Sequence, residues 1–226
     1  MGRFITRFSN LIELVSEQGL GGLWKRIATW AWRTREYVFL NKSLSNEISD
    51  VESEEVYFQI SRDDDIPWLC QNMQHLGENA EKIIRQQFVG KDVTIVGRSK
   101  ENPELMAFSA WLSNGDFAFN LLKNVVSPGD VSIRRVWVPP AMRKKGLATF
   151  GMRYAEFAAS RNNVRKIWSF VETDNINSLK LHDKLGYSTL GRIKMIKRFG
   201  RSSAKVKFNS GIKWQSYAVP SDRTKL

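Results

Sequence analysis

The chain has 226 residues and a mass of 26.0 kDa, which is enough for one α/β domain with an appended segment. Its hydrophobic (42%) and charged (26%) fractions are those of a globular protein and exclude wholesale disorder, and its single cysteine excludes an intramolecular disulfide. Lys and Arg (35) outnumber Asp and Glu (23), and the net charge of +12 favours an anionic partner: nucleic acid, acidic lipid or a phosphorylated small molecule.

Three further classes of protein are not expected. Cys70, His75 and His182 do not have the spacing of a zinc site, so we expect no metal. No apolar run approaches the roughly 20 residues of a membrane-spanning helix. Glu13 and Glu17 interrupt the apolar stretch in which a secretory signal would lie. A reducing, cytoplasmic location is therefore the expectation.

Residues 1–44 are basic and rich in tryptophan, and they predict an amphipathic helical extension. Apolar residues recur at helical spacing over 3–18 and again over 23–31, with glycines between, and a short strand is expected at Tyr37–Leu40. Such an extension lies peripherally on an anionic membrane, packs on the following domain, or packs on a second copy of the chain in a homodimer. The sequence leaves these alternatives open.

The remaining chain divides by composition into an acidic linker at 45–54, a main domain at 55–217 and a basic tail at 218–226. Strand patterns occur at Val56–Ile60, Val93–Val96, Leu105–Leu112, Phe117–Leu121, Val131–Val138, Lys166–Val171, Ser188–Ile196 and Lys205–Trp214. Helical patterns occur at Ile66–Leu76, Glu78–Phe88, Gly146–Ser160 and Asn177–Leu185. This order predicts an α/β fold with one mixed sheet.

The segment Val136–Ala148 ends a strand, passes through two prolines and a cationic turn at 143–145, and opens a helix at Gly146. The first N–H groups of a helix have no intrahelical partner and lie at the positive end of its dipole. They can bind a phosphate or diphosphate, and the small residues Gly146 and Ala148 let the anion approach. Taken alone, the turn is equally consistent with an ordinary basic helix N-terminus.

A second informative segment, Val171–Tyr187, contains a polar loop, a helix and a glycine after a strand. Leu181 and Leu185 lie four residues apart, so both face the core from one side of the helix. Gly186 permits the left-handed backbone that often ends a helix. The segment therefore predicts a strand–loop–helix unit.

Together the two segments resemble the two signature motifs of the GNAT superfamily of acyl-CoA N-acyltransferases. The first motif, Val-x-Pro-x-x-Arg-x-x-Gly-x-Ala, is met by Val138, Pro140, Arg143, Gly146 and Ala148. The second is met by Asn175, Ser178, Leu181, Leu185, Gly186 and Tyr187. The resemblance covers residues 56–214 and implies a GNAT-like fold behind the N-terminal extension.

The resemblance implies that acetyl-CoA, or another acyl-CoA, is the cosubstrate and that no metal is needed. Its diphosphate would rest on the main chain of Arg143, Lys144, Lys145, Gly146, Leu147 and Ala148. Its pantetheine arm would pair with Val136, Trp137 and Val138, where this strand and Lys166–Val171 splay apart. Asn175 would hydrogen-bond the amide arm, and Ser178 lies one helical turn later.

The resemblance also implies that the acceptor amine attacks the thioester directly. A main-chain N–H near Trp137 and Val138 would polarise the thioester carbonyl. Family members often place a tyrosine four residues before the glycine of the second motif, where this chain has His182. A protonated imidazole can donate to the departing thiolate, so we hypothesise that His182 is the general acid. The alternative is a half-buried histidine without a catalytic part.

Glu172, which leaves the strand near the predicted splay, is the candidate general base for the amine. The alternative is a solvated residue paired with Lys166 or Arg165. His75 and Cys70 are expected to pack on helix faces, because we see no base that would make the thiol a nucleophile.

The function predicted from these residues is transfer of an acetyl or other acyl group from acyl-CoA to a primary amine. The acceptor is unknown, and an amino sugar or another anionic or membrane-presented amine fits the positive charge. The alternative is a basic module that binds nucleic acid or membrane on a GNAT scaffold without catalysis. Nucleic acid is the less expected partner, because no recognised binding motif accompanies the basic C-terminal strands.

Overall fold

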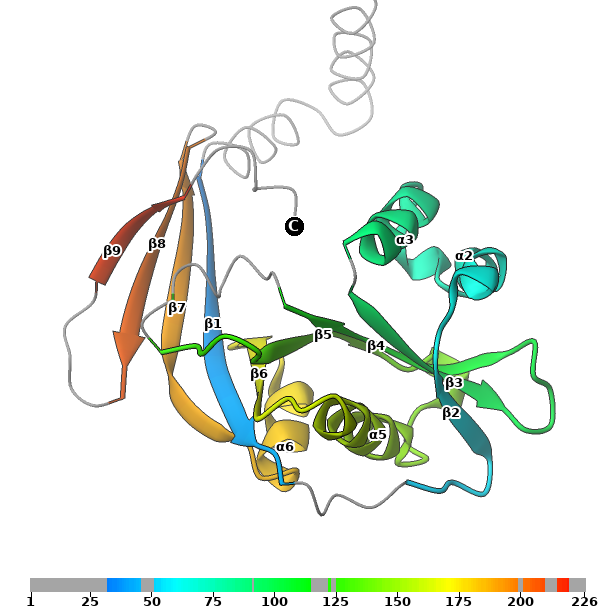
Figure 1. The fold of residues 1–226 in the computed structure, drawn as a ribbon. Helices are drawn as coiled ribbons and strands as arrows, with labels where there is room; N and C mark the ends of the chain where they lie inside the picture. Colours follow the sequence, from blue (N-terminus) through cyan, green and yellow to red (C-terminus); the bar gives the residue numbers. More distant parts are fainter. Residues whose placement is uncertain are drawn as a thin grey trace, which may run out of the picture. The chain divides into compact units, whose positions relative to one another are not determined.

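The computed structural model describes residues 32–45, 51–90, 92–114, 122, 125–198, 201–209 and 215–219 (Figure 1). The predicted helices over 3–18 and 23–31 and the predicted strand over 117–121 lie outside these residues. The chain divides into two compact units, one formed by Val38–Gly191 and the other by the residues before and after it. In the described part, no helix has the length and apolarity needed to cross a bilayer.

The described strands form one mixed sheet in the order β2-β3-β4-β5-β6-β1-β7-β8-β9. The strands are β1 (Trp32–Ser43), β2 (Val56–Ile60), β3 (Val93–Ser99), β4 (Met106–Ser113), β5 (Val131–Trp137), β6 (Lys166–Glu172), β7 (Ser188–Arg198), β8 (Arg201–Phe208) and β9 (Gln215–Val219). The helices are η1 (Asp63–Asp65), α2 (Ile66–Asn72), η2 (Gln74–Leu76), α3 (Ala80–Val89), η3 (Pro140–Met142), α5 (Leu147–Arg161) and α6 (Ile176–Lys184). The predicted mixed α/β fold is confirmed.

Two local predictions differ from the structure. Inside the predicted helical extension, β1 runs from Trp32 to Ser43 and is longer than the predicted strand Tyr37–Leu40. The single strand predicted over 205–214 is wrong, because β8 ends at Phe208 and β9 pairs back on it antiparallel. The predicted domain boundaries at 44/45, 54/55 and 217/218 stay predictions.

The sheet of the larger unit has two apolar faces. On one face, Phe108 and Ala110 of β4 belong to a core cluster with Met152 and Ala155 of α5. On the other face, Trp111 packs in a second cluster that contains residues of α2 and α3. Figure 1 shows α2 and α3 on one side of β3, β4 and β5, with α5 on the opposite side. β4 therefore sends alternate side chains to opposite faces of the sheet.

Helix α5 lies close against the sheet because Gly151 has no side chain. A Cβ atom at this position would overlap the ring of Phe108, which is a steric clash. The close contact fixes the position of α5, whose first turn follows directly on the first sequence motif.

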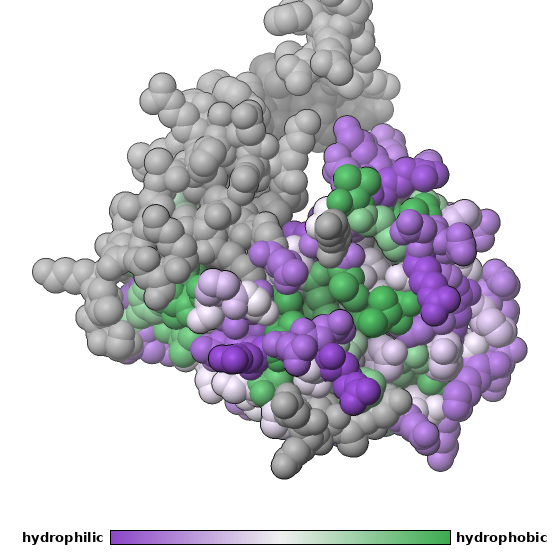
Figure 2. All heavy atoms as spheres, viewed as in Figure 1, coloured by the Kyte–Doolittle hydropathy of each residue, from purple (hydrophilic) through white to green (hydrophobic). Residues whose placement is uncertain are grey.

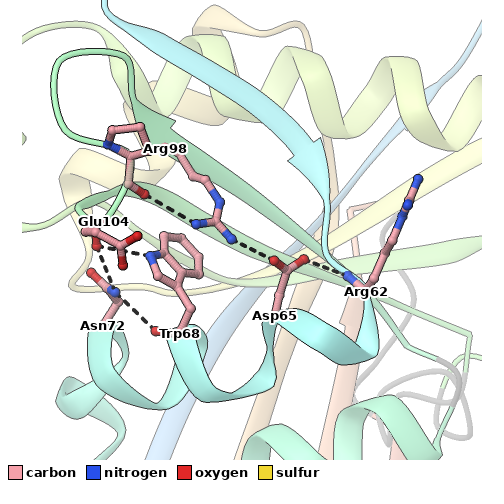
Figure 3. Close-up of polar contacts among 7 residues, drawn as sticks. Arg62, Asp65, Trp68, Asn72, Arg98 and Glu104 are labelled. Carbon is pink, nitrogen blue, oxygen red and sulfur yellow. Dashed lines mark hydrogen bonds and ion pairs between the residues drawn. The ribbon is translucent and has the colours of Figure 1, made fainter.

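A polar network holds α2 on the sheet (Figure 3). The Arg98 guanidinium lies 3.7 Å from the centre of the Trp68 ring and forms a 2.6 Å ion pair with Asp65, at the start of α2. At the end of α2, the Asn72 amide donates to the carbonyl of Trp68 and accepts from the main-chain N–H of Met106. Helix α2 consequently ends at Asn72, earlier than predicted, and η2 follows.

The space-filling view agrees with this arrangement. Figure 2 shows hydrophobic side chains gathered where the helices meet the sheet and hydrophilic ones on the outer surface of α2 and α3. In the smaller unit, the exposed residues Lys205 and Lys207 alternate along β8 with the buried residues Ala204 and Val206. The lysines of this strand therefore face solvent.

Candidate active site

The first motif forms a tight loop between β5 and α5. Pro139 and Pro140 lead into the short helix η3, and the Arg143 side chain turns back to donate to the carbonyl of Val138, 3.0 Å from its Nε. The backbone then enters the left-handed region at Lys144 (φ 66°) and again at Gly146 (φ 77°), which caps α5. Gly146 adopts this conformation without a Cβ penalty, which explains its place in the motif.

The main-chain N–H groups of this loop are available to a ligand. Within the described part of the chain, no residue accepts a hydrogen bond from the N–H groups of Lys144–Ala148. The next two N–H groups, of Thr149 and Phe150, donate to the carbonyl of Gly146 and begin the helix. The loop therefore presents consecutive donors at the positive end of the dipole of a 15-residue helix.

The three cations of the loop have different surroundings. Arg143 is bound to the loop itself. Lys145 forms an exposed ion pair with Glu55 at 2.9 Å, and the hydrogen bond to this carboxylate raises the pKa of Lys145. The Lys144 side chain has no acidic partner among the described residues, so it is the cation of this turn that is available to an anionic ligand.

Strands β5 and β6 separate where the resemblance implied that they would. Parallel pairing joins Val131 to Ile167, Ser132 to Trp168 and Ile133 to Ser169. Beyond Ile133, β5 continues to Trp137 without a partner in β6. The free edge of β5 runs from Arg134 to Trp137 and ends a few residues before the loop at 143–148, so an elongated ligand on the loop could extend along it.

A β-bulge changes the direction of the side chains in this part of β5. Trp111 of β4 is opposite Arg134, but Ser109 is opposite Trp137, so β5 contains one extra residue, and Arg135 has a positive φ of 52°. The bulge places both Arg134 and Arg135 on the face covered by α2 and α3, where Arg134 binds Asp92 at 2.7 Å. The sequence contains no signal for this bulge, because arginine is not a residue that favours positive φ.

His75 contributes to the same face, which the sequence did not indicate. Its ring, in η2, stacks on Trp137 with 4.0 Å between ring centres and an interplanar angle of 8°. Burial, followed by the charge of Arg135, lowers the pKa of His75. The histidine predicted to have a packing role therefore lies beside the strand predicted to hold the pantetheine arm.

The second motif forms the start of α6. The Asn175 side chain accepts a hydrogen bond from the N–H of Ser178 at 3.2 Å and caps the helix. This cap uses the side-chain oxygen of Asn175, so the amide nitrogen is the atom left for a ligand. Glu172 lies half-buried at the end of β6, and its carbonyl accepts from the N–H of Asn175.

His182 is placed differently from the predicted proton donor. It is only 2% exposed, and its Nδ1 lies 2.7 Å from the carbonyl oxygen of Ser178, to which it must donate. Its Nε2 is buried and finds no hydrogen-bond partner in the described part of the chain. Burial lowers the pKa of His182, which favours the neutral ring with no proton on Nε2. A general-acid role for His182 stays a prediction and would require a second proton on the buried Nε2.

The described residues include no group of three His, Cys, Asp or Glu side chains that could hold a metal ion.

Residues 24–187 match the model of the acetyltransferase (GNAT) family, and the matched span contains both motif segments. The chain belongs to the GNAT acetyltransferase family. The resemblance inferred from the two motifs is thus confirmed. A search of curated proteins found none that matches the sequence.

Solved structures of similar fold include GNAT proteins. A GCN5-related N-acetyltransferase from Sphaerobacter thermophilus has a TM-score of 0.58 and 11% identity, over 79% of this chain and 56% of that one. A Drosophila protein has a TM-score of 0.53 and 17% identity, over 80% of this chain and 58% of that one. A region of a fungal GH3 β-N-acetylglucosaminidase, described as a GCN5-related glucosamine N-acetyltransferase, has a TM-score of 0.54 and 14% identity, over 77% of this chain and 22% of that one.

These three proteins are longer than the region they share with this chain, which covers less than two thirds of each. At identities of 11–17%, the likeness shows the GNAT fold alone.

Proposed function

We propose that this chain is an N-acetyltransferase that moves the acetyl group of acetyl-CoA to a primary amine by direct attack. The observation that carries the proposal is the row of unpartnered N–H groups at Lys144–Ala148, beside the separation of β5 and β6. The diphosphate of acetyl-CoA needs several hydrogen-bond donors, and its pantetheine arm needs a strand edge with free main-chain groups. This region supplies both.

The cofactor-binding residues follow from the motifs. The diphosphate would accept hydrogen bonds from the loop, formed by Arg143, Lys144, Lys145, Gly146, Leu147 and Ala148. The amide groups of the pantetheine arm would pair with the main chain of Val136, Trp137 and Val138, and with the side chains of Asn175 and Ser178. When bound, acetyl-CoA supplies the activated thioester, and the protein supplies orientation and proton transfer.

In the reaction, the amine nitrogen forms a bond to the thioester carbonyl carbon, and the carbon–sulfur bond then breaks. The carbonyl oxygen becomes negative in between, and main-chain N–H groups at Trp137 and Val138 would stabilise it. An ammonium acceptor loses one proton to a base before it attacks, and its nitrogen loses a second to solvent as the amide forms. The thiolate leaving group takes one proton from solvent. His182, the acid proposed from sequence, could serve this role only when a second proton occupies its buried Nε2, because its Nδ1 proton is donated to Ser178.

Two residues are candidates for the base. Glu172 at the end of β6 is the one predicted from sequence. His75 has the stronger structural support, because its ring stacks on Trp137 beside the proposed carbonyl site. Its lowered pKa keeps the imidazole neutral at pH 7, and a neutral imidazole can accept the proton of an ammonium acceptor.

The acceptor proposed from sequence is an amino sugar or another anionic or membrane-presented amine. The net charge of +12 supports an anionic acceptor. The fungal neighbour described as a glucosamine N-acetyltransferase is compatible with an amino sugar. Presentation at a membrane would depend on residues 1–31, which lie outside the described residues.

The proposal is tested by titrating the full-length protein with acetyl-CoA in a calorimeter and by following thiol release with a panel of amines. Gly146→Ala should weaken acetyl-CoA binding by about tenfold or more, because it changes the backbone that orients charge-assisted hydrogen bonds. Gly129→Ala is the matched control, since Gly129 also has a positive φ (89°) but lies in the turn before β5. Retention on nucleic acid or anionic vesicles without acetyl-CoA binding would instead favour the non-catalytic binding module.

A further inference from the structure

Arg135 has an unusual position for an arginine. It is exposed in the β5 bulge, and its guanidinium carbon lies 4.8 Å from the centre of the buried Trp111 ring. Its neighbour Arg134 is neutralised by Asp92 at 2.7 Å and also binds Gln87 at 3.0 Å. By contrast, no acidic side chain in the described part of the chain pairs with Arg135.

The backbone at this position is strained. Arg135 has a φ of 52°, a conformation that side chains other than Gly, Asn and Asp rarely adopt. Such residues persist where the surrounding structure enforces them, and they cluster at sites of function. Here the strained conformation directs a second guanidinium to the face that already holds Arg134.

Two buried polar groups without partners among the described residues lie on the stretch of β4 that pairs with the bulge. Trp111 is 1% exposed and Ser109 is fully buried, yet neither the indole Nε1 nor the hydroxyl has a hydrogen-bond partner among the described residues. Both side chains belong to β4 on the strand stretch paired with the bulge, and Ser109 is directly opposite Trp137. Buried donors of this kind usually have a partner in the protein or its ligands.

We propose that Arg135 binds a carboxylate or phosphate of the acceptor, so that the acceptor is an amine that carries a negative charge. This inference rests on the proposed acetyl transfer, and it names Arg135 as the residue that selects the class of acceptor. The planar guanidinium matches carboxylate and phosphate oxygens in a bidentate geometry, and its contact with the Trp111 ring restrains its position. Trp137 and His75 would form the adjacent wall, which brings the amine toward the carbonyl site.

The same geometry couples anion binding to His75. His75 stacks on Trp137, two residues after Arg135 in β5, and the positive charge of Arg135 contributes to the lowered pKa of this histidine. An anion bound at Arg135 would offset that charge and make the imidazole a stronger base. The acceptor would thus strengthen the base that removes its own proton.

The test is steady-state kinetics of the full-length protein at saturating acetyl-CoA with matched amine pairs. The pairs are glucosamine with glucosamine 6-phosphate, and cadaverine with lysine, which separate phosphate from carboxylate recognition. We expect kcat/KM to be about tenfold or more higher for the anionic member of at least one pair, as a charge-assisted hydrogen bond would give. Arg135→Gln should remove this preference mainly through KM, and Arg135→Lys should restore part of it.

Arg161→Gln is the control, because Arg161 is an exposed arginine at the far end of α5 from the loop. It removes the same charge and should leave the preference unchanged. Unchanged acetyl-CoA affinity in Arg135→Gln would show that this variant is folded and cofactor-competent.

The outcomes distinguish the two proposals. The role of Arg135 is overturned if both members of each pair are acetylated with equal kcat/KM, or if Arg135→Gln lowers kcat/KM equally for both members. Either result leaves the proposed acetyl transfer unaffected. Acetyl-CoA binding without acetylation of either anionic amine also overturns it. Failure to bind acetyl-CoA at all refutes the transferase itself.

Discussion

The cofactor side and the acceptor side of the proposed site are built in different ways. The cofactor side is one contiguous loop, Arg143–Ala148, and the main-chain N–H groups of Lys144–Ala148 are its proposed ligands. The acceptor side combines side chains from η2, β4 and β5, which lie far apart in the sequence. Main-chain ligands need only a backbone shape, whereas side-chain ligands must be brought together by packing. The following predictions test whether the two sides act separately.

The largest expected effect is on the acceptor side. His75→Ala should lower kcat by about 100-fold or more if the imidazole is the base, with no change in acetyl-CoA affinity. The lowered pKa places the acidic limb of the wild-type pH–rate profile below about 6.5, and activity should rise with pH through it. Steady-state kinetics between pH 5 and 9 measure both.

His75→Phe is the informative control for this prediction, because it keeps a ring that can stack on Trp137 but cannot accept a proton. If His75→Phe retains wild-type kcat, the histidine only positions Trp137. If Glu172→Gln removes the acidic limb instead, Glu172 is the base.

The next largest effect is expected at Gly151, where α5, the helix that follows the proposed cofactor loop, packs on the sheet. Gly151→Ala should destabilise the protein by about 1–3 kcal/mol, because the added methyl group overlaps the Phe108 ring and moves α5 away from the sheet. Denaturant unfolding measures the change. Adding Phe108→Leu should recover part of the loss, and a Gly151→Ala variant as stable as the wild type would contradict the packing described.

A smaller effect is a pH dependence of stability from His182. The native pKa of this buried histidine is lower than its unfolded value of about 6.5, so the unfolded chain binds the proton first as pH falls. Stability should therefore be complete above pH 6.5 and decline below it. His182→Asn, which can still donate to the carbonyl of Ser178, should flatten this decline in thermal unfolding measured from pH 7.5 to 5. An unchanged slope in the variant would show that other groups cause it.

The smallest effect is expected for the ion pair at the edge of the cofactor loop. Glu55→Gln releases Lys145, and exposed pairs of this kind contribute little to stability. Unfolding should be unchanged, while acetyl-CoA affinity should increase slightly at low salt and not at high salt. A clear loss of affinity would mean that Glu55 orders the loop.

The difference between the two sides also decides what could be predicted from sequence. The loop was predictable because its chemistry depends on prolines, a glycine and the start of a helix, which are local signals. The bulge was not, since Arg135 gives no local sign of a positive φ. The stack of His75 on Trp137 depends on how η2 packs against β5, which is a tertiary event.

His182 illustrates the limit of motif comparison. Its position in the second motif suggested a catalytic proton, but the i, i−4 hydrogen bond to the carbonyl of Ser178 and the burial of the ring depend on the packing of α6. The burial and hydrogen bonding of a motif residue therefore depend on tertiary packing, which the motif itself does not indicate.

Because β5 contains one extra residue, the face to which its side chains point depends on the length of the strand as well as on its sequence. Deleting Val136 would restore simple alternation and turn one of the two guanidinium groups toward the α5 side. Related enzymes could therefore change which substrates they accept through a single-codon insertion or deletion, with every neighbouring side chain conserved.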